Sequence, residues 1–279
     1  MAQKATLSRY FASESGPRNR TRQRLRRGLT GVVVLLAIAE LLGRTGVVSP
    51  AVLPLASTVL DRAAGLLGNG RFLADLAATV AAWAIGLLIA VVVAVPAGLV
   101  LGSLPGVRTA TMVIVELLRP IPSVALIPLV SLIIGVGPRM TITLIVYAAV
   151  WPVLFNTIYG LQSVEPVAKQ TLRSFGFSQA SVLMRVSLPS AAPFIATGIR
   201  LASSIAIIVA VAVGIVAGRI NGPGIGAFIA DANSGAGNTA LVLAATLWAG
   251  VLGLILDALA VTAERRMFHW HSAYARESG

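Results

Sequence analysis

Residues 163–193 read SVEPVAKQTLRSFGFSQASVLMRVSLPSAAP, a polar stretch rich in helix-forming residues that stands between long apolar segments. We refer to it as the polar segment. It holds about thirty residues, whereas a connector that only joins two helices needs far fewer. A charged loop of this length between membrane spans is long enough to dock into another protein.

The chain around the polar segment is strongly apolar. Hydrophobic residues make up 57% of its 279 positions and charged residues 11%, whereas roughly 25% of a typical soluble domain is charged. Five runs contain no Asp, Glu, Lys or Arg: Leu76–Val107, Pro120–Pro138, Met140–Val164, Leu201–Gly218 and Ala232–Leu256. Each approaches or exceeds the roughly 20 residues that a spanning helix needs. The sequence therefore predicts an all-α membrane protein with at least five spans.

A sixth apolar stretch, residues 28–48, is interrupted by Glu40 and Arg44. These two residues stand four positions apart, so they can pair on one face of a helix. The stretch also has the layout of a signal peptide, with basic residues before it and a small-residue cleavage pattern near Ala37. We expect an uncleaved sixth span, because the apolar character resumes at Leu41.

Residue types and charge disfavour several classes of function. The chain has no cysteine, which excludes disulfides and thiolate metal sites. His269 and His271 stand two positions apart and do not share a helix face, so we expect no metal site. The formal charge is +12, but eight of the 22 basic residues precede Gly28 and the others are scattered at span ends. This distribution disfavours nucleic-acid binding.

Basic residues close to membrane spans stay on the cytoplasmic side, so their distribution predicts the orientation. Sixteen Lys and Arg fall in the N-terminal arm, the polar segment, the tail and the segments on their side, against five on the opposite side. Both termini and the polar segment are then cytoplasmic. The predicted organisation is a basic arm at 1–27, an N-terminal transmembrane helix at 28–48, a transmembrane region at 73–262 containing the polar segment at 163–193, and a tail at 263–279.

Two short helices are expected within the polar segment. The first runs from Glu165 to Phe175 and ends at Gly176, which can adopt the left-handed conformation that terminates helices. The second begins after Ser178, a suitable N-cap, and stops before Pro189. From physics alone, such a hairpin could serve as a docking knob for a protein or lie on the lipid surface as an amphipathic element.

The spacing of Gly176, nine residues, and then Val186-Ser187-Leu188-Pro189 resembles the E-A-A-x3-G-x9-I-x-L-P signature of one transporter family. This is the family of inner-membrane permease subunits of ATP-binding cassette (ABC) importers. Gln170, Thr171 and Leu172 occupy the E-A-A positions, so the acidic residue of the signature is missing. The runs 116–128 and 156–166 resemble the nitrate, sulfonate and taurine branch of that family, and the similarity extends from about Leu73 to Trp270.

The resemblance implies a type I ABC importer permease fold with six transmembrane helices, a five-helix core plus one N-terminal helix. It also implies that the polar segment couples the permease to a separate ATPase. The implied coupling residues are Gln170, Thr171, Leu172, Arg173, Ser174, Gly176, Val186, Leu188 and Pro189. The implied partners are two ABC ATPase subunits, an extracytoplasmic solute-binding protein and a second permease subunit, most simply a homodimer. No cofactor is expected on this chain, since ATP and Mg are used by the partner ATPase.

Four further residues are candidates for a gate or translocation path: Glu116, Arg119, Pro122 and Pro128. Prolines inside spans permit kinks beside a cavity, although ordinary helix bends are the simpler explanation of them. Glu116 and Arg119, three positions apart, can form a structural pair or contact the cargo. The same branch of the family often has an acidic residue within 213–218, where this chain has none.

The leading interpretation is a transport permease for a small anion such as a sulfonate, nitrate or taurine. It is not expected to be an enzyme, because neither lysine ends a phosphate-binding G-x-x-x-x-G-K-[ST] loop and no span carries a Cys, His or Lys for hydrolysis. The alternative is an ion-coupled secondary transporter, which more often has inverted repeats and ionisable residues at mid-membrane.

Overall fold

The computed structural model describes residues 17–46, 49, 52–235 and 238–267. The chain divides into two compact units, one comprising residues 1–61 and the other residues 62–279. Every regular element in the described residues is helical. The all-α prediction is therefore confirmed for this part of the chain.

The first unit contains helix α2 (Pro17–Arg44) and the first residues of α3 (Ala56–Leu66). The predicted pair between Glu40 and Arg44 forms, with Arg44 Nε donating to Glu40 Oε1 at 2.8 Å. Glu40 also accepts hydrogen bonds from the backbone N–H and hydroxyl of Ser57, in the first turn of α3. The charges that interrupt the apolar stretch thus connect the end of one helix to the start of the next.

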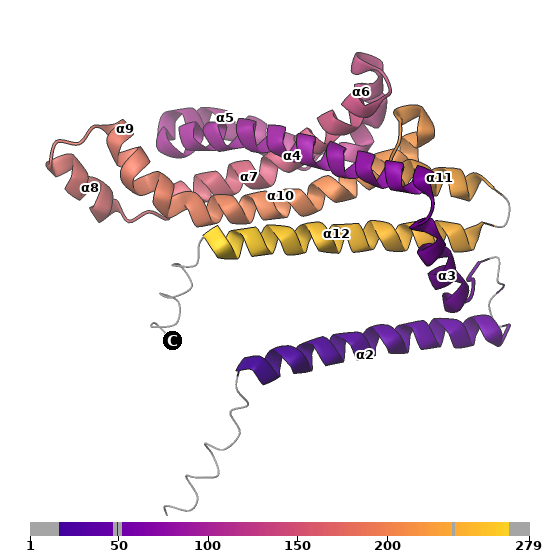
Figure 1. The fold of residues 1–279 in the computed structure, drawn as a ribbon. Coiled ribbons are helices and arrows are strands. Elements are labelled where there is room, and N and C mark those ends of the chain that lie inside the picture. The colour runs from indigo at the N-terminus through magenta and orange to yellow at the C-terminus, as the bar shows by residue number, and fades with distance from the viewer. Residues whose placement is uncertain (1–16, 47–48, 50–51, 236–237, 268–279) are drawn as a thin grey trace, which may run out of the picture. The chain divides into compact units, whose positions relative to one another are not determined.

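The second unit is built on four long helices that run side by side (Figure 1): α4 (Gly70–Ser103), α7 (Pro138–Gln162), α10 (Leu188–Ala217) and α12 (Thr239–Met267). Among the described residues, four spans are long and apolar enough to cross a membrane. A fifth arises if a bent pair of helices, Gly106–Leu118 and Ser123–Ile134, counts as one span. The expected count of six is not confirmed, because α2, with its charged residues, is not among these.

Shorter elements complete the second unit. They are α5 (Pro105–Leu118), the 3-10 turn η1 (Ser123–Leu126), α6 (Ile127–Ile134), α8 (Pro166–Ser174), α9 (Gln179–Val182), the π turn η2 (Leu183–Ser187), the 3-10 turn η3 (Gly218–Asn221) and α11 (Ile225–Ser234). Helices α8 and α9 lie at one end of the long helices, whereas α6 and α11 lie at the other (Figure 1).

Helix α7 is central, since it packs along both α4 and α10. Glycines allow this close approach. A Cβ atom at Gly98 of α4 would lie 2.6 Å from the Cβ of Thr157 in α7, and one at Gly198 of α10 would lie 2.9 Å from the carbonyl oxygen of Pro152. Small residues at helix contacts are typical of membrane proteins, where close van der Waals packing replaces the hydrophobic effect between helices.

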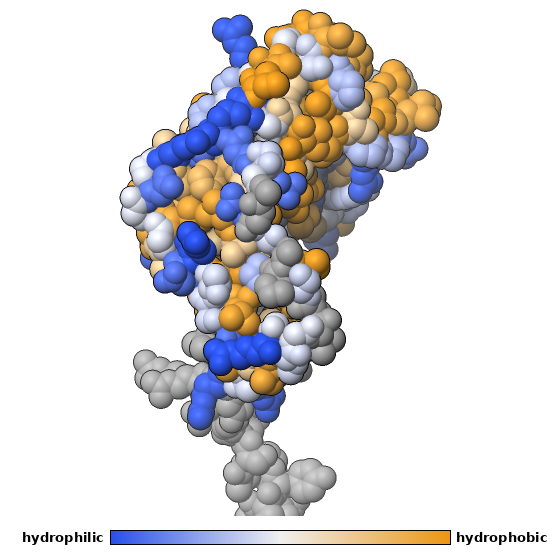
Figure 2. Space-filling model, turned by 90° about the vertical axis from the view of Figure 1, so that its right-hand side faces the viewer, coloured by the Kyte–Doolittle hydropathy of each residue, from blue (hydrophilic) through white to orange (hydrophobic). Residues whose placement is uncertain are grey.

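The outside of the second unit is apolar. Leu132, Ile133 and Leu254 have exposed fractions of 85%, 71% and 72%. Seen from the end opposite the polar segment, broad apolar surface adjoins hydrophilic groups (Figure 2). An exterior of this kind is stable in lipid rather than in water, as the composition predicts.

Candidate functional site

The limits of α8, the first helix of the polar segment, are set by the residues at its two ends. Glu165 is the N-cap of α8, and Pro166 occupies the first helical position, where its missing N–H costs nothing. At the other end Gly176 adopts φ +81°. The N–H of Gly176 donates to the Arg173 carbonyl at 2.9 Å, and that of Phe177 donates to the Leu172 carbonyl at 3.1 Å. These two bonds form a Schellman motif, which confirms the predicted helix end.

The second helix begins as predicted but does not stop where expected. The Ser178 hydroxyl accepts a hydrogen bond from the Ser181 N–H, as an N-cap does. The prediction that Pro189 ends the helix is wrong, because Pro189 lies in the first turn of α10. The π turn at 183–187 precedes it, and the Leu188 N–H reaches back to the Leu183 carbonyl. This wider turn lets the helix continue past a residue that lacks an N–H and crowds the preceding turn.

The structure brings the predicted coupling residues onto one hairpin. Gln170, Thr171, Leu172, Arg173 and Ser174 lie on α8, Gly176 follows it, Val186 lies in the π turn, and Leu188 and Pro189 begin α10. Leu188 packs against the buried cluster of Leu161, Ala191 and Ile195. It anchors the hairpin to the helix bundle rather than facing outward.

Helix α8 presents two different faces. Lys169 and Arg173, four positions apart, line a cavity beneath the hairpin. Val167 and Thr171 fall on the other side of the helix, about 120–160° from Lys169 and Arg173 at 100° per residue. Val167 is 66% exposed, and Phe175 at the tip is 77% exposed. The hairpin therefore carries apolar side chains outward, away from the cavity.

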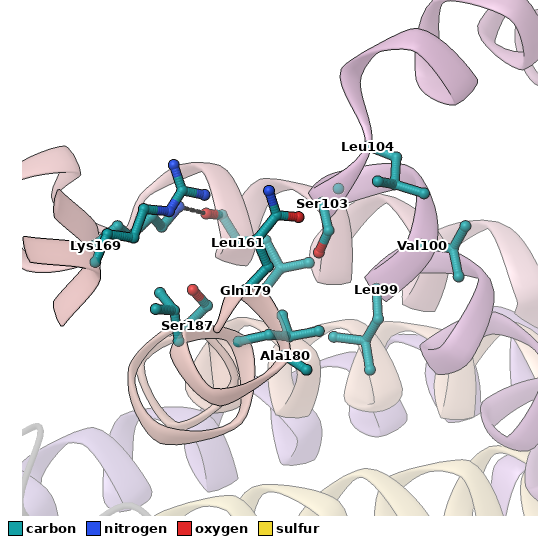
Figure 3. A pocket seen from close by; sticks show the side chains of 13 residues that line it. Leu99, Val100, Ser103, Leu104, Leu161, Lys169, Gln179, Ala180 and Ser187 are labelled. Atoms are coloured by element: carbon teal, nitrogen blue, oxygen red, sulfur yellow. Dashed lines mark hydrogen bonds between the residues drawn. The ribbon is translucent and has the colours of Figure 1, made fainter. Parts of the chain in front are cut away.

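The cavity has a volume of about 460 Å³ and lies between the ends of α4 and α7 and the hairpin. Lys169 is held at its edge, because its Nζ donates to the carbonyl oxygen of Leu161 at 2.8 Å (Figure 3). Burial, followed by the nearby charge of Arg173, lowers the pKa of Lys169 from its ordinary value. No carboxylate lies among the residues that line the cavity.

Three of the predicted path residues lie at or near the bend between α5 and η1. Helix α5 ends before Arg119, Pro122 is the N-cap of η1, and Pro128 stands in the first turn of α6. The helical stretches on either side of the break meet at 82°. Within the expected span from Pro120 to Pro138 only residues 123–134 are helical, which is shorter than the roughly 20 residues that a single spanning helix needs. Pro120 and Pro122 stand in the bend that separates this stretch from α5.

The predicted pair between Glu116 and Arg119 does not form. The Arg119 guanidinium instead stacks over the Phe155 ring of α7, 4.6 Å from its centroid, and it has no carboxylate partner within the described ranges. Arg119 is the C-cap of α5, so it stands just past the last residue of that helix. A second contact joins the end of α5 to α7: the Tyr147 hydroxyl of α7 donates a hydrogen bond to the Leu118 carbonyl at 2.6 Å.

One polar network at the other end of the bundle was not predicted. Asp75 of α4 is 1% exposed and accepts two hydrogen bonds from Arg219, at 3.0 and 3.1 Å, and a third from the Gly224 N–H. Arg219 also donates to Asp231 of α11 at 2.6 Å, and Arg71 to the same carboxylate at 2.8 Å. Asp75 and Arg219 are 144 positions apart, so no local pattern pairs them.

Helix α11 (Ile225–Ser234) lies within the glycine-rich stretch at 219–238. Most of this stretch is helical, and Ile225, Phe228 and Ile229 are buried. Gly226 lies against Gly214 of α10, at a spacing where a Cβ atom would have no room. Within the described part of the chain, no group of three His, Cys, Asp or Glu residues could hold a metal ion.

Comparison with known proteins shows the family to which the chain belongs. Residues 94–269 match the model of the binding-protein-dependent transport system inner membrane component. The chain is 30% identical over 245 residues to the taurine transport system permease protein TauC of Escherichia coli, covering 86% of this chain and 88% of that protein. It is 30% identical to the putative aliphatic sulfonates transport permease protein SsuC of Bacillus subtilis, covering 89% and 88%.

A third relative is the nitrate import permease protein NrtB of Leptolyngbya laminosa, 29% identical over 66% of this chain and 65% of that protein. The fold also resembles a chain of the inward-facing MetNI methionine ABC transporter, with a TM-score of 0.56 and 20% identity. That match covers 69% of this chain and 92% of the solved one. The protein therefore belongs to the binding-protein-dependent transport system inner membrane components, the multi-pass permease subunits of ABC importers, which are transport proteins rather than enzymes.

Proposed function

We propose that the polar segment is the surface by which a separate ABC ATPase drives this permease. The observation that carries the proposal is the outward face of the hairpin. Val167 and Phe175 are 66% and 77% exposed on an otherwise polar element, and Met184 is 61% exposed. Apolar side chains displayed by a rigid, capped hairpin suit insertion into a cleft of a protein partner. In this arrangement, ATP and Mg act on the ATPase and not on this chain.

The proposed assembly is that of an ABC importer, the class of transporter to which the family's permease subunits belong. Two ATPase subunits engage two permease subunits, most simply two copies of this chain, and an extracytoplasmic solute-binding protein delivers the cargo. The distribution of basic residues supports an orientation with both termini and the polar segment in the cytoplasm. The network of Asp75, Arg219 and Asp231 then lies on the outer side.

The proposed cargo is a small oxyanion such as a sulfonate or nitrate. The named relatives act on taurine, aliphatic sulfonates and nitrate. Arg119 supplies a positive charge at the break between α5 and η1, free of any carboxylate partner in the described residues. Trp151 lies on α7 four positions before Phe155, the ring on which Arg119 stacks. Its buried indole N–H has no acceptor among the described residues. A guanidinium and an unused N–H donor are suited to bind an anion.

The coupling role is tested with the complex reconstituted from this chain, its ATPase and its binding protein. Phe175→Ala should weaken association with the ATPase by roughly 30-fold, as expected for a central apolar anchor worth ~2 kcal/mol. Cargo-stimulated ATP hydrolysis should fall with it. The matched control is Ile220→Ala, which removes an apolar side chain of 84% exposure in η3, just past the opposite end of α10.

Equal ATPase affinity for Phe175→Ala and Ile220→Ala would contradict the assignment. The alternative of an ion-coupled carrier has its own test, since the chain alone would then accumulate cargo in sealed vesicles under an ion gradient without nucleotide. For the cargo, Arg119→Gln should raise the concentration for half-maximal uptake at least tenfold, whereas Arg119→Lys should retain part of the affinity. Unchanged uptake by Arg119→Gln removes this residue from the path.

A further inference from the structure

The cavity beneath the hairpin carries positive charge that the protein does not neutralise. Lys169 and Arg173 both line it, and neither forms an ion pair with a described carboxylate. The Lys169 Nζ is fixed by its bond to the Leu161 carbonyl, so this charge cannot move freely away from Arg173. Two like charges held beside one cavity are stabilised when an anion lies between them.

Neutral polar groups share the wall with the two cations. Ser103 comes from the last turn of α4, Gln179 from the first turn of α9, and Ser187 from the π turn. Their side chains are grouped around the same space as Lys169 (Figure 3). Hydroxyl and amide groups add hydrogen-bond donors to the charges, and a phosphate has several oxygens to accept them.

One side of the cavity is apolar and open. Leu99, Val100 and Leu104 line it from the end of α4, and Val100 and Leu104 are 49% and 45% exposed. A site with cations at one side and exposed apolar residues at the other is suited to an amphiphile as well as to a free ion. The opposite face of α8, which holds Val167, remains available to a protein partner.

We propose that this cavity binds a phosphate group, either free phosphate or the headgroup of an anionic phospholipid. The bound phosphate accepts hydrogen bonds from Lys169 and Arg173 and connects α8 to the ends of α4 and α7. The site concerns binding by this chain alone and does not depend on the coupling or cargo assignments.

The test uses the full-length chain, purified and delipidated, with native mass spectrometry as the readout. Three probes are titrated separately: phosphatidylglycerol, phosphatidylcholine and inorganic phosphate. The variant Lys169→Gln/Arg173→Gln should weaken binding of the phosphate probe about 30-fold, from the loss of two charges near a phosphate at about 1 kcal/mol each. The control is Arg265→Gln/Arg266→Gln, which removes the same charge from the last turn of α12, away from the cavity.

A saturable phosphatidylglycerol site that the cavity variant loses and the control keeps supports the proposal with lipid as the source. A saturable inorganic phosphate site with the same dependence supports it with free phosphate as the source. Equal binding of phosphatidylglycerol and phosphatidylcholine without phosphate binding overturns it, as does an equal loss in the control. If the double variant does not fold, the exposed Arg173→Gln alone should weaken binding about fivefold, and an unchanged affinity overturns the proposal.

Discussion

Replacing Asp75 should destabilise the permease more than replacing any of the exposed acidic residues. Asp75 is 1% exposed and accepts three hydrogen bonds, two of them from Arg219 and one from the Gly224 N–H. In Asp75→Asn the side chain keeps its shape but loses its charge, and its amide nitrogen presents donors where acceptors are needed. The remaining carbonyl oxygen can still accept from the Gly224 N–H and one Arg219 N–H, whereas the second Arg219 N–H faces the new NH₂ group and the guanidinium loses its buried counter-charge.

The magnitude follows from burial. Removing one member of a buried ion pair costs about 3–5 kcal/mol. The Arg219 side chain is 32% exposed and keeps Asp231, so water and the second carboxylate reduce the loss to the lower end of that range. We expect about 3 kcal/mol, a roughly 100-fold change in the folding equilibrium. Asp231→Asn is the matched control, since its carboxylate is 38% exposed and an exposed pair contributes about 1 kcal/mol or less.

The free energy of unfolding is measured by titrating the purified chain in mixed micelles with a denaturing detergent and following tryptophan fluorescence. The chain has four tryptophans for this purpose. The double variant Asp75→Asn/Arg219→Gln should lose less than the sum of its single variants, because no unpaired charge is left behind. The reasoning is refuted if Asp75→Asn costs no more than Asp231→Asn.

Three further predictions concern other parts of the second unit. Gly98→Ala should destabilise the chain by about 1–3 kcal/mol in the same titration, because its Cβ would lie 2.6 Å from Thr157, whereas Gly250→Ala, with open space around it, should not. Gly176→Ala should cost about 1–2 kcal/mol of local stability, seen as faster amide exchange in α8, because φ is +81° there. The folded pKa of Lys169 lies below its ordinary value of 10.5, so the unfolded chain binds more protons between those two values. Stability relative to Lys169→Gln should therefore rise with pH in that window, and a falling difference would contradict the pKa shift.

Much of the fold could be predicted because a membrane span is recognised from the apolar composition of a short stretch of sequence. Uninterrupted apolar runs located α4, α7, α10 and α12, and the glycine and serine of the polar segment located its turn and cap. The errors arose where local rules compete. Pro189 is a helix stop by itself, but a π turn before it allows the helix to continue. The run from Pro120 to Pro138 is apolar enough to span, yet only residues 123–134 of it are helical.

The candidate sites were only partly predictable. The predicted coupling residues were found from the spacing of Gly176, Val186, Leu188 and Pro189, and the structure brings them together at one hairpin and the start of α10. The stacking of Arg119 on Phe155 and the pairing of Asp75 with Arg219 depend on helices that are far apart in sequence. Charge patterns within one helix favoured Glu116 as the partner of Arg119, whereas tertiary packing offered an aromatic ring instead.

The helical backbone from Gln179 to Asn221 continues for 43 residues through α9, the π turn, α10 and η3. Within this stretch α10 is a single helix of 30 residues, about 45 Å long at 1.5 Å per residue, and it ends at Gly218, where φ is +61°. A displacement imposed on the first turn of α10 is expected to reach its last turn, because the two are parts of one hydrogen-bonded helix. Just past that end, Arg219 of η3 is held by Asp75 and Asp231. A motion begun at one end of the bundle therefore reaches the other end at these carboxylates.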